Sequence, residues 1–481
     1  MRKIVVIISF ILCIVSAINA QQVQVTFDLN YEATESVEPI SVKQGCVLPL
    51  DKKPMPQREG YRFGGWYTSK ECQVADEWLF GSKSGGYFKP AIDSMAVEKP
   101  MTLYAKWVAP KHIKDAEGLN AMREDLHGWY VLDNDIDLSA IEDWEPVGVY
   151  EADYEWADGE WWKNGFKGKL DGQGHSIRNL KLTKPTQEKK ALFGTLVNGE
   201  ISNLVIEDCV VDMHTTSMYV APLVGIMKQD GALVASITNV QVKNAMFKVN
   251  LKNTKSAFSG VTGITVGAWN GTISQCSVQG LMDITMNGTG GGELYIGGIA
   301  GENYSHTVDC QTNLQVNVHF RQPQMDNEFK VFVGGLVASA TNVNGCEAKG
   351  NISIDGDAKT KQLYIGGLVG SGRYGEISHS SSQVKVALNG LTHAQVGGIV
   401  GEYNKTYGGV GAALGMKLTT LHDCHANVEV DADASVQLVR GAISGSGKPD
   451  TLKAWGGQMD YNLYNCTWEG TIPDAIDKDL F

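Results

Sequence analysis

The stretch Ile296-Gly-Gly-Ile-Ala-Gly301 decides the fold, because close copies of it return along the C-terminal part of the chain. An internal repeat of a few tens of residues is one unit that cannot bury its apolar side alone, so successive units must stack. The repeat therefore predicts a solenoid and not a row of independent globules. The best copies occupy residues 333–338, 365–370 and 396–401, and degenerate copies occupy 220–225, 261–266 and 439–444.

A column of small or medium residues follows the copies at a fixed place in the repeat. Equivalent side chains of stacked parallel strands lie about 4.8 Å apart, so an inward column becomes a ladder through the core. Cysteine behaves there as a small hydrophobe, and we expect five cysteines to form a structural ladder of buried thiols. The column contains Leu204, Val240, Cys276, Cys310, Cys346, Ser380, Cys424 and Cys466, at spacings of 36, 36, 34, 36, 34, 44 and 42 residues.

Three short strands are expected within one repeat, over residues 363–369, 376–381 and 383–388. The glycine pair supplies a turn or a close approach of two backbones. Three strands per rung and about eight rungs define an all-β fold, a right-handed parallel β-helix over residues 166–470. A C-terminal tail, residues 471–481, follows it.

Composition and the N-terminus indicate export. The chain has 41 basic and 54 acidic residues, a net charge of −13, which argues against nucleic acid and anionic lipid as partners. A basic start, a short apolar run and small residues before Gln21 predict a signal peptide over residues 1–20. No later segment is apolar enough to span a bilayer. We therefore expect a location in the cell envelope, at the cell surface or outside the cell.

Residues 21–108 form a first module. Its alternating strands and the run Gly60-Tyr-Arg-Phe-Gly-Gly-Trp-Tyr67 closely resemble the Listeria–Bacteroides repeat, also called the internalin-type B repeat. The resemblance implies a small β-grasp-like module of bacterial surface proteins. Cys46 and Cys72 are either a disulfide or two free thiols. Alternation with polar residues predicts a half-buried aromatic core made by Phe27, Tyr61, Phe63, Trp66, Tyr104 and Trp107.

Residues 109–165 are expected to cap the solenoid, with a helix over 116–126 and a strand over 129–138. The lead-in Phe166-Lys-Gly-Lys-Leu-Asp-Gly-Gln-Gly-His-Ser-Ile177 and the repeated glycines resemble the GLUG-motif domain of secreted bacterial proteins. That resemblance implies surface and adhesin-type proteins, some with an adjacent immunoglobulin-cleaving peptidase domain. The chain departs from the motif at Ala221, Pro222, Thr262 and Arg440.

Asp171 and His175 invite an acid–base interpretation. The favoured alternative is a turn in which Asp171 accepts hydrogen bonds from backbone amides.

Asp133, Asp135 and Asp137 imitate the start of a calcium loop but lack its later glycine and glutamate, so an outward row of aspartates is favoured. The Gly-x-Gly-x-x-Gly motif at 370–375 leads into a predicted strand, whereas a dinucleotide-binding site needs a helix there. The motif is therefore not interpreted as a dinucleotide site.

An insertion at residues 149–163 is rich in aromatic and acidic residues. Exposed aromatic faces stack on sugars or bind proteins, which makes this insertion the candidate ligand site. The alternative is a lid that covers the open end of the solenoid. The candidate residues are Tyr154, Trp156, Trp161 and Trp162.

These patterns predict a non-catalytic cell-surface or secreted binding protein of adhesin type, engaging a glycan or a surface protein of a host or bacterium. No catalytic residue, cofactor or metal is assigned. Two alternatives stay open: a polysaccharide lyase or glycoside hydrolase on the β-helix scaffold, and a structural spacer of the cell envelope. The basis is partly fold-level analogy, since solenoids offer long surfaces for weak multivalent contact.

Overall fold

The computed structural model forms two compact units, one ending at Lys111 and one beginning at His112. Nearly all regular structure is β, and no described helix is long and apolar enough to cross a membrane. The structure describes residues 21–78, 80, 95–148, 164–184, 189–215, 219–228, 235–252, 257–287, 292–321, 329–356, 362–373, 375–403, 420–434, 436–441, 443–445 and 463–470.

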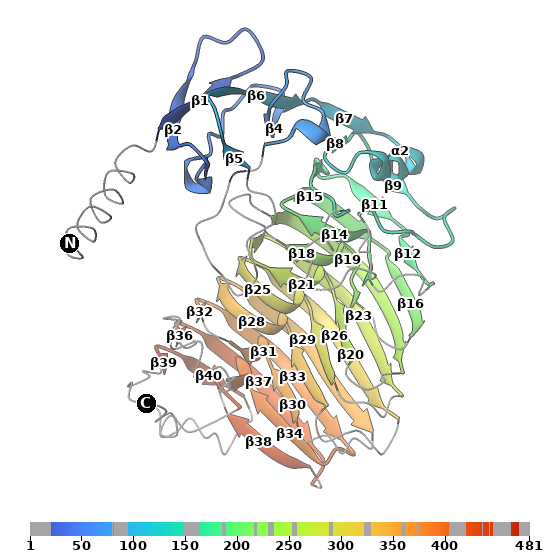
Figure 1. The fold of residues 1–481 in the computed structure, drawn as a ribbon. Helices are drawn as coiled ribbons and strands as arrows, with labels where there is room; N and C mark the ends of the chain where they lie inside the picture. The colour runs from blue at the N-terminus through green and yellow to red at the C-terminus, as the bar shows by residue number, and fades with distance from the viewer. Residues whose placement is uncertain are drawn as a thin grey trace, which may run out of the picture. The chain divides into compact units, whose positions relative to one another are not determined.

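The first unit is built on a mixed four-stranded sheet of order β2-β1-β6-β4 (Figure 1). The first and last strands, β1 and β6, run parallel at its centre, while β2 and β4 pair antiparallel at the edges. This is the predicted β-grasp-like arrangement. Its elements are β1 (Gln22–Asp28), β2 (Val37–Lys43), β3 (Cys46–Val47), η1 (Leu50–Lys52), β4 (Arg62–Tyr67), η2 (Val74–Asp76), β5 (Ala96–Val97) and β6 (Met101–Val108).

Alternation along these strands buries an aromatic core. Trp66 is fully buried and packs edge-on against Phe27, with ring centroids 4.7 Å apart. Phe63 and Trp107 pack partly buried around it. The predictions for Tyr61 and Tyr104 were wrong. Tyr61 precedes β4, is 39% exposed and lies under the Arg58 guanidinium. Tyr104 is not part of this core, because it alternates along β6 with the buried Leu103 and Ala105.

The two cysteines of the first unit are unbonded in this structure. Cys46 is exposed, whereas Cys72 is buried. The Cys72 thiol lies 3.7 Å from the carbonyl oxygen of Ala105 on the central strand β6. Burial is the main reason that the pKa of Cys72 is raised, which disfavours its reactive thiolate form.

A short helical segment opens the second unit. Asp115 caps it by accepting a hydrogen bond from the Gly118 amide (2.8 Å), and Leu119 and Met122 are buried beneath. The α-helix is shorter than predicted because its second half tightens into a 3₁₀ turn, as helix ends often do. The elements are β7 (Pro110–Ile113), α2 (Ala116–Asn120), η3 (Ala121–Glu124), β8 (Trp129–Leu132) and β9 (Ile136–Asp137).

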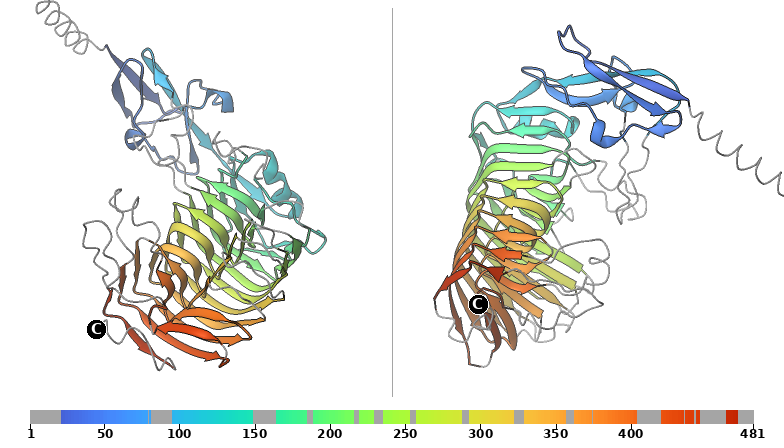
Figure 2. Two further views of the ribbon diagram at one scale, coloured as in Figure 1. Left: turned by 60° about the horizontal axis from the view of Figure 1, so that its bottom comes forward. Right: turned by 90° about the vertical axis from the view of Figure 1, so that its left-hand side faces the viewer.

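The rest of the second unit is a parallel β-helix, which confirms the predicted fold class. Its turns stack with strand under strand (Figure 2), and each turn has three sides. The first side carries the glycine pair and is an eight-stranded parallel sheet. Its strands are β13 (Lys189–Lys190), β17 (Tyr219–Val220), β20 (Ala257–Thr262), β24 (Gly292–Gly297), β27 (Lys330–Gly334), β30 (Gln362–Gly366), β34 (His393–Gly397) and β38 (Gln437–Gly441).

The second and third sides form one continuous sheet, because several strands bend around the corner between them. Strands mainly of the second side are β10 (Lys169–Asp171), β14 (Phe193–Val197), β18 (Val224–Lys228), β21 (Thr265–Trp269), β22 (Thr272–Ser274), β25 (Ala300–Val308), β28 (Val337–Asn344), β31 (Val369–Gly372), β32 (Glu376–Ser378), β35 (Val400–Tyr403), β36 (Thr420–His422) and β39 (Leu463–Tyr464). Strands that form or reach the third side are β11 (Ser176–Arg178), β12 (Lys181–Leu182), β15 (Glu200–Glu207), β16 (Val210–Thr215), β19 (Ser236–Leu251), β23 (Ser277–Met286), β26 (Gln311–Phe320), β29 (Glu347–Gly356), β33 (Ser381–Asn389), β37 (His425–Ala432) and β40 (Thr467–Glu469).

The glycine pair forms the corner between the first and second sides. A Cβ on Gly335 would lie 2.2 Å from the carbonyl oxygen of Gly367 in the next turn. A Cβ on Gly334 would lie 1.9 Å from the carbonyl oxygen of Val337, within the same corner. Only glycine permits both approaches. The predicted single strand 363–369 is therefore wrong, since this corner divides it into β30 and β31.

Register within the stack follows the sequence columns. The column three residues before the cysteines pairs rung to rung from Ile201 through Ile237 and Ile273 and on to Leu463. The cysteine column is buried as well, and the Cys346 thiol accepts a hydrogen bond from the Cys310 amide (3.3 Å). The exposed fractions are 1% for Cys276, 0% for Cys310, 2% for Cys346, 1% for Cys424 and 5% for Cys466.

Replacing Gly335 by alanine should destabilise the second unit. The new methyl group meets a backbone oxygen that cannot move without shifting a neighbouring turn, so we expect a loss of roughly 1–3 kcal/mol or more in the free energy of unfolding. Gly267→Ala is the matched control, because a Cβ there has no neighbour nearer than 3.4 Å. Equal melting temperatures for the two variants would contradict this account of the corner.

A thiol reagent applied to the native protein should label Cys46 and leave the five ladder cysteines unmodified. Buried thiols are shielded from the reagent. The pKa values of Cys310, Cys346 and Cys424 are also raised, which disfavours their reactive thiolate forms. Peptide mass spectrometry measures the modification, and the same reaction in denaturant provides the control in which every site reacts. Labelling of Cys310 as fast as Cys46 would show that the interior is open to water.

Candidate functional site

The predicted ligand residues Tyr154, Trp156, Trp161 and Trp162 lie outside the described residues, within 149–163. Their role stays a prediction of the sequence. The candidate site is therefore sought on the described surface of the β-helix.

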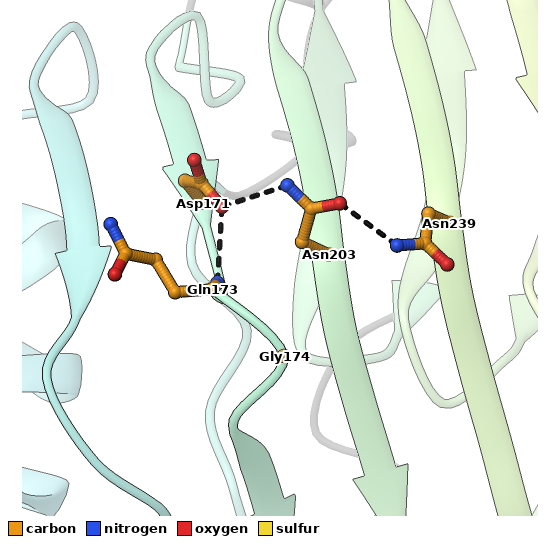
Figure 3. Close-up of a pocket in the computed structure, with 5 residues that line it drawn as sticks. All are labelled: Asp171, Gln173, Gly174, Asn203 and Asn239. Atoms are coloured by element: carbon orange, nitrogen blue, oxygen red, sulfur yellow. Dashed lines mark hydrogen bonds between the residues drawn. The ribbon is translucent and has the colours of Figure 1, made fainter.

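A shallow polar hollow lies where the first turns pass from the second side to the third (Figure 3). Its volume is about 450 Å³. Asp171 accepts hydrogen bonds from the Gln173 amide and from the Asn203 side chain, both at 3.0 Å. Asn239 donates in turn to Asn203 at 2.9 Å. The lining groups are thus bonded to one another, and Asp171 caps its own turn as the favoured interpretation holds.

Hydrogen bonds of this kind follow from the backbone at the corner. Asn203 and Asn239 have φ values of +52° and +53°, a conformation that asparagine tolerates better than most residues. Stacked turns place such side chains at parallel-strand spacing, so each amide reaches the next. This row holds the corner together and explains why the sequence repeats polar residues there.

His175 does not pair with Asp171 but faces Asp135, with Nδ1 and Oδ1 3.5 Å apart. Asp135 also accepts from the Ser176 amide, and this backbone hydrogen bond is the main reason that its pKa is lowered. Asp133 contacts His112 (2.6 Å) and Asp137 accepts from the Ser139 amide (2.8 Å). Each of the three aspartates therefore has partners of its own.

An aromatic stack with ionic neighbours lies on the outside of the glycine-pair corner. Tyr295, Phe332 and Tyr364 come from successive strands of the first side and stack with centroids 5.3 and 5.4 Å apart. Arg373 donates to Glu302 at 3.0 Å and to the Tyr295 hydroxyl at 3.2 Å. Burial raises the pKa of Glu302, and the positive charge of Arg373 offsets only part of that rise. Sequence reasoning missed this cluster, because its members belong to different repeats.

The third side offers the widest regular surface. Alternation along β26, β29, β33 and β37 sends apolar residues inward and polar residues outward. Register lines the outward residues up across the turns. The resulting polar face consists of two rows, Gln315, Asn351, Lys385 and Glu429 in one and Asn313, Lys349, Gln383 and Asn427 in the other.

Comparison with known proteins agrees with the interpretation of the first unit. Residues 24–106 match the family model of the Listeria–Bacteroides repeat domain, which confirms that resemblance. Domains of this family occur in surface or secreted proteins. A search of curated proteins found no match.

Two solved structures are similar to this chain. One is described as a "putative immunoglobulin A1 protease from Bacteroides ovatus"; the match has 16% identity and a TM-score of 0.39, and covers 75% of this chain and 84% of that one. The other is described as "IgA1 Protease"; it has 11% identity and a TM-score of 0.42 over 93% of this chain. This chain spans 29% of that second protein.

Ion pairs at the edge of the polar face should make stability depend on pH. Burial pushes the pKa of Asp355 up, but hydrogen bonds from Arg321 and His319 outweigh it and hold the pKa below its usual value. A carboxyl group whose pKa is lower in the folded protein than in the unfolded chain stabilises the folded state at pH values above the unfolded pKa. This stabilisation is lost as the pH falls through the pKa of the folded protein.

Asp355→Asn should therefore lower the free energy of unfolding at pH 7, by less than about 1 kcal/mol because solvent screens the pair. The deficit should shrink as the pH falls below about 4. Denaturant titrations at pH 7 and pH 3 measure it. Asp431→Asn, at an exposed carboxylate on β37, is the control. A deficit that stays constant with pH would contradict the assignment.

Proposed function

We propose that this protein is a non-catalytic, exported binding protein of adhesin type whose polar face contacts a glycan or a protein surface. The polar face is the observation that carries the proposal. Its amide and charged side chains stand in straight rows on rigid strands, so they are pre-ordered for many weak hydrogen bonds at once. The Listeria–Bacteroides repeat domain in the first unit supports a surface or secreted location.

The β-helix itself is proposed to be a GLUG-type repeat domain over residues 166–470. Its support is the repeated glycine pair, which the close backbone approach requires at the corners that carry it, such as Gly334-Gly335 and Gly366-Gly367. The aromatic insertion at 149–163 is proposed as a second contact region, on the strength of its sequence alone.

Purified protein should retain at least one glycan or host protein on an array. Replacing Asn313, Gln315 and Asn351 together by alanine should weaken that retention at least about tenfold, since each net hydrogen bond contributes roughly 0.5–1.5 kcal/mol. The matched control replaces Ser202, Thr272 and Thr420, half-buried polar residues of the second side. A Trp156, Trp161 and Trp162 triple-alanine variant tests the insertion in the same assay.

Three results would count against the proposal. Equal loss in the polar-face and control variants would remove the face as the contact site. No retained ligand on any array would favour the structural spacer. Depolymerisation of a glycan would favour an enzyme.

The enzyme alternative has one observation in its favour. Glu302 carries a pKa raised by burial and lies beside Arg373 and Tyr295, and a carboxyl group with a raised pKa is what general acid catalysis requires. A polysaccharide lyase or glycoside hydrolase would then act at the aromatic stack. Depolymerisation by the wild type, lost in a folded Glu302→Gln variant, would establish this alternative.

A further inference from the structure

Two histidines and an aspartate converge at one corner of the β-helix, where β32 and β36 lead from the second side to the third. His379 Nε2 lies 3.6 Å from Asp423 Oδ2, and His422 Nδ1 lies 2.7 Å from the same oxygen. Ligand atoms of the three residues all lie within 4.8 Å of one another. No other three His, Cys, Asp or Glu side chains in the described part of the chain come this close.

Backbone register, and not chance side-chain orientation, brings these groups together. Ser378 pairs with His422 in adjacent turns, and the His379 amide donates to the His422 carbonyl at 3.3 Å. His379 and Asp423 therefore occupy the same corner position one turn apart. Both adopt the left-handed conformation, with φ of +49° and +52°.

The equivalent corner positions of the other turns lack this combination. They carry Asn203, Asn239, Gln275, Asp309, Gly345 and Asn465. A histidine directly above a His-Asp pair thus distinguishes this corner from a row that otherwise serves to bond the turns together.

We propose that His379 Nε2, His422 Nδ1 and Asp423 Oδ2 bind a divalent transition-metal ion of the zinc type. Two imidazole nitrogens and one carboxylate oxygen are a borderline donor set that suits zinc, whereas calcium and magnesium favour oxygen alone. Tetrahedral zinc holds such donors about 3.3 Å apart, a value that lies between the 2.7 Å and 3.6 Å by which the two imidazole nitrogens are separated from Asp423 Oδ2. Three protein ligands leave a fourth position for water or an external group.

Surrounding side chains can orient the ligands, as the outer groups of metal sites do. His422 Nε2 lies 3.2 Å from Glu376 Oε1, so the ring can donate there while Nδ1 binds the ion. Asn465 donates to the second oxygen of Asp423 at 3.1 Å, which leaves Oδ2 for the metal. His422 is held with only 12% of its side chain exposed, while His379 is 61% exposed.

Calorimetric titration of the metal-stripped full chain with zinc chloride tests the site. We expect one equivalent to bind and to raise the melting temperature, as a ligand of the folded state must. His379→Ala should weaken binding more than tenfold, and Glu376→Gln about tenfold. His425→Ala is the control, because this histidine lies in the same turn but contacts Thr467.

Cobalt(II) provides an independent readout of the donor atoms. The spectrum should lack the thiolate charge-transfer band that binding at the exposed Cys46 would produce. Asp423→Asn serves as a second ligand variant if His379→Ala fails to fold in the metal-free state. Absence of zinc binding, equal weakening in the His425→Ala control, or a thiolate band would overturn the proposal. Glycan or protein retention in the zinc-free protein is a separate measurement, so the two proposals can fail independently.

Discussion

The close approach of backbone to backbone at the glycine pair is the constraint on which the β-helix depends. The carbonyl oxygen of Gly367 occupies the space that a side chain on Gly335 would need, and Gly398 does the same for Gly367. The corners at Gly335, Gly367 and Gly398 are thereby packed directly against one another. Once this distance is fixed, the three sides have no freedom to slip, and every inward residue meets its counterpart in the adjacent turns.

The opposite corner is stabilised differently. There the chain turns through left-handed residues, and asparagine and aspartate side chains link one turn to the next. Polar residues that look like a catalytic cluster in the sequence, such as Asp171, are largely occupied by this task. The same geometry brings metal-binding side chains close together where the residue type at this corner changes, as it does at His379 and Asp423.

Sequence reasoning reached the architecture because its determinants are periodic. The column that contains the cysteines is aligned from spacing alone, and the structure pairs the residues three positions before it rung by rung, from Ile201 to Leu463. The ends of the strands were harder to predict, because a corner made by two glycines looks like part of a strand in the sequence. Tyr61 was misplaced because alternation indicates which residues share a side, but not where a strand begins.

The candidate sites were harder to predict, because they join residues from different repeats. Glu302 and Arg373 are 71 residues apart in the chain, and nothing local relates them. The His379 corner did leave a signal, visible only after the repeats are aligned: histidine and His-Asp precede the same column in consecutive turns. Searching each aligned column for residues that differ in type from the rest of that column would have found the His379 corner.

Unequal repeats with an equal pitch have an evolutionary consequence. The two longest spacings, 44 and 42 residues, separate positions that still lie in adjacent rungs. The pairing of the described strands therefore does not require repeats of equal length, and the entropic cost of a longer connection rises only slowly with its length. Repeat length can therefore change at these connections without changing which inward residues pair between rungs.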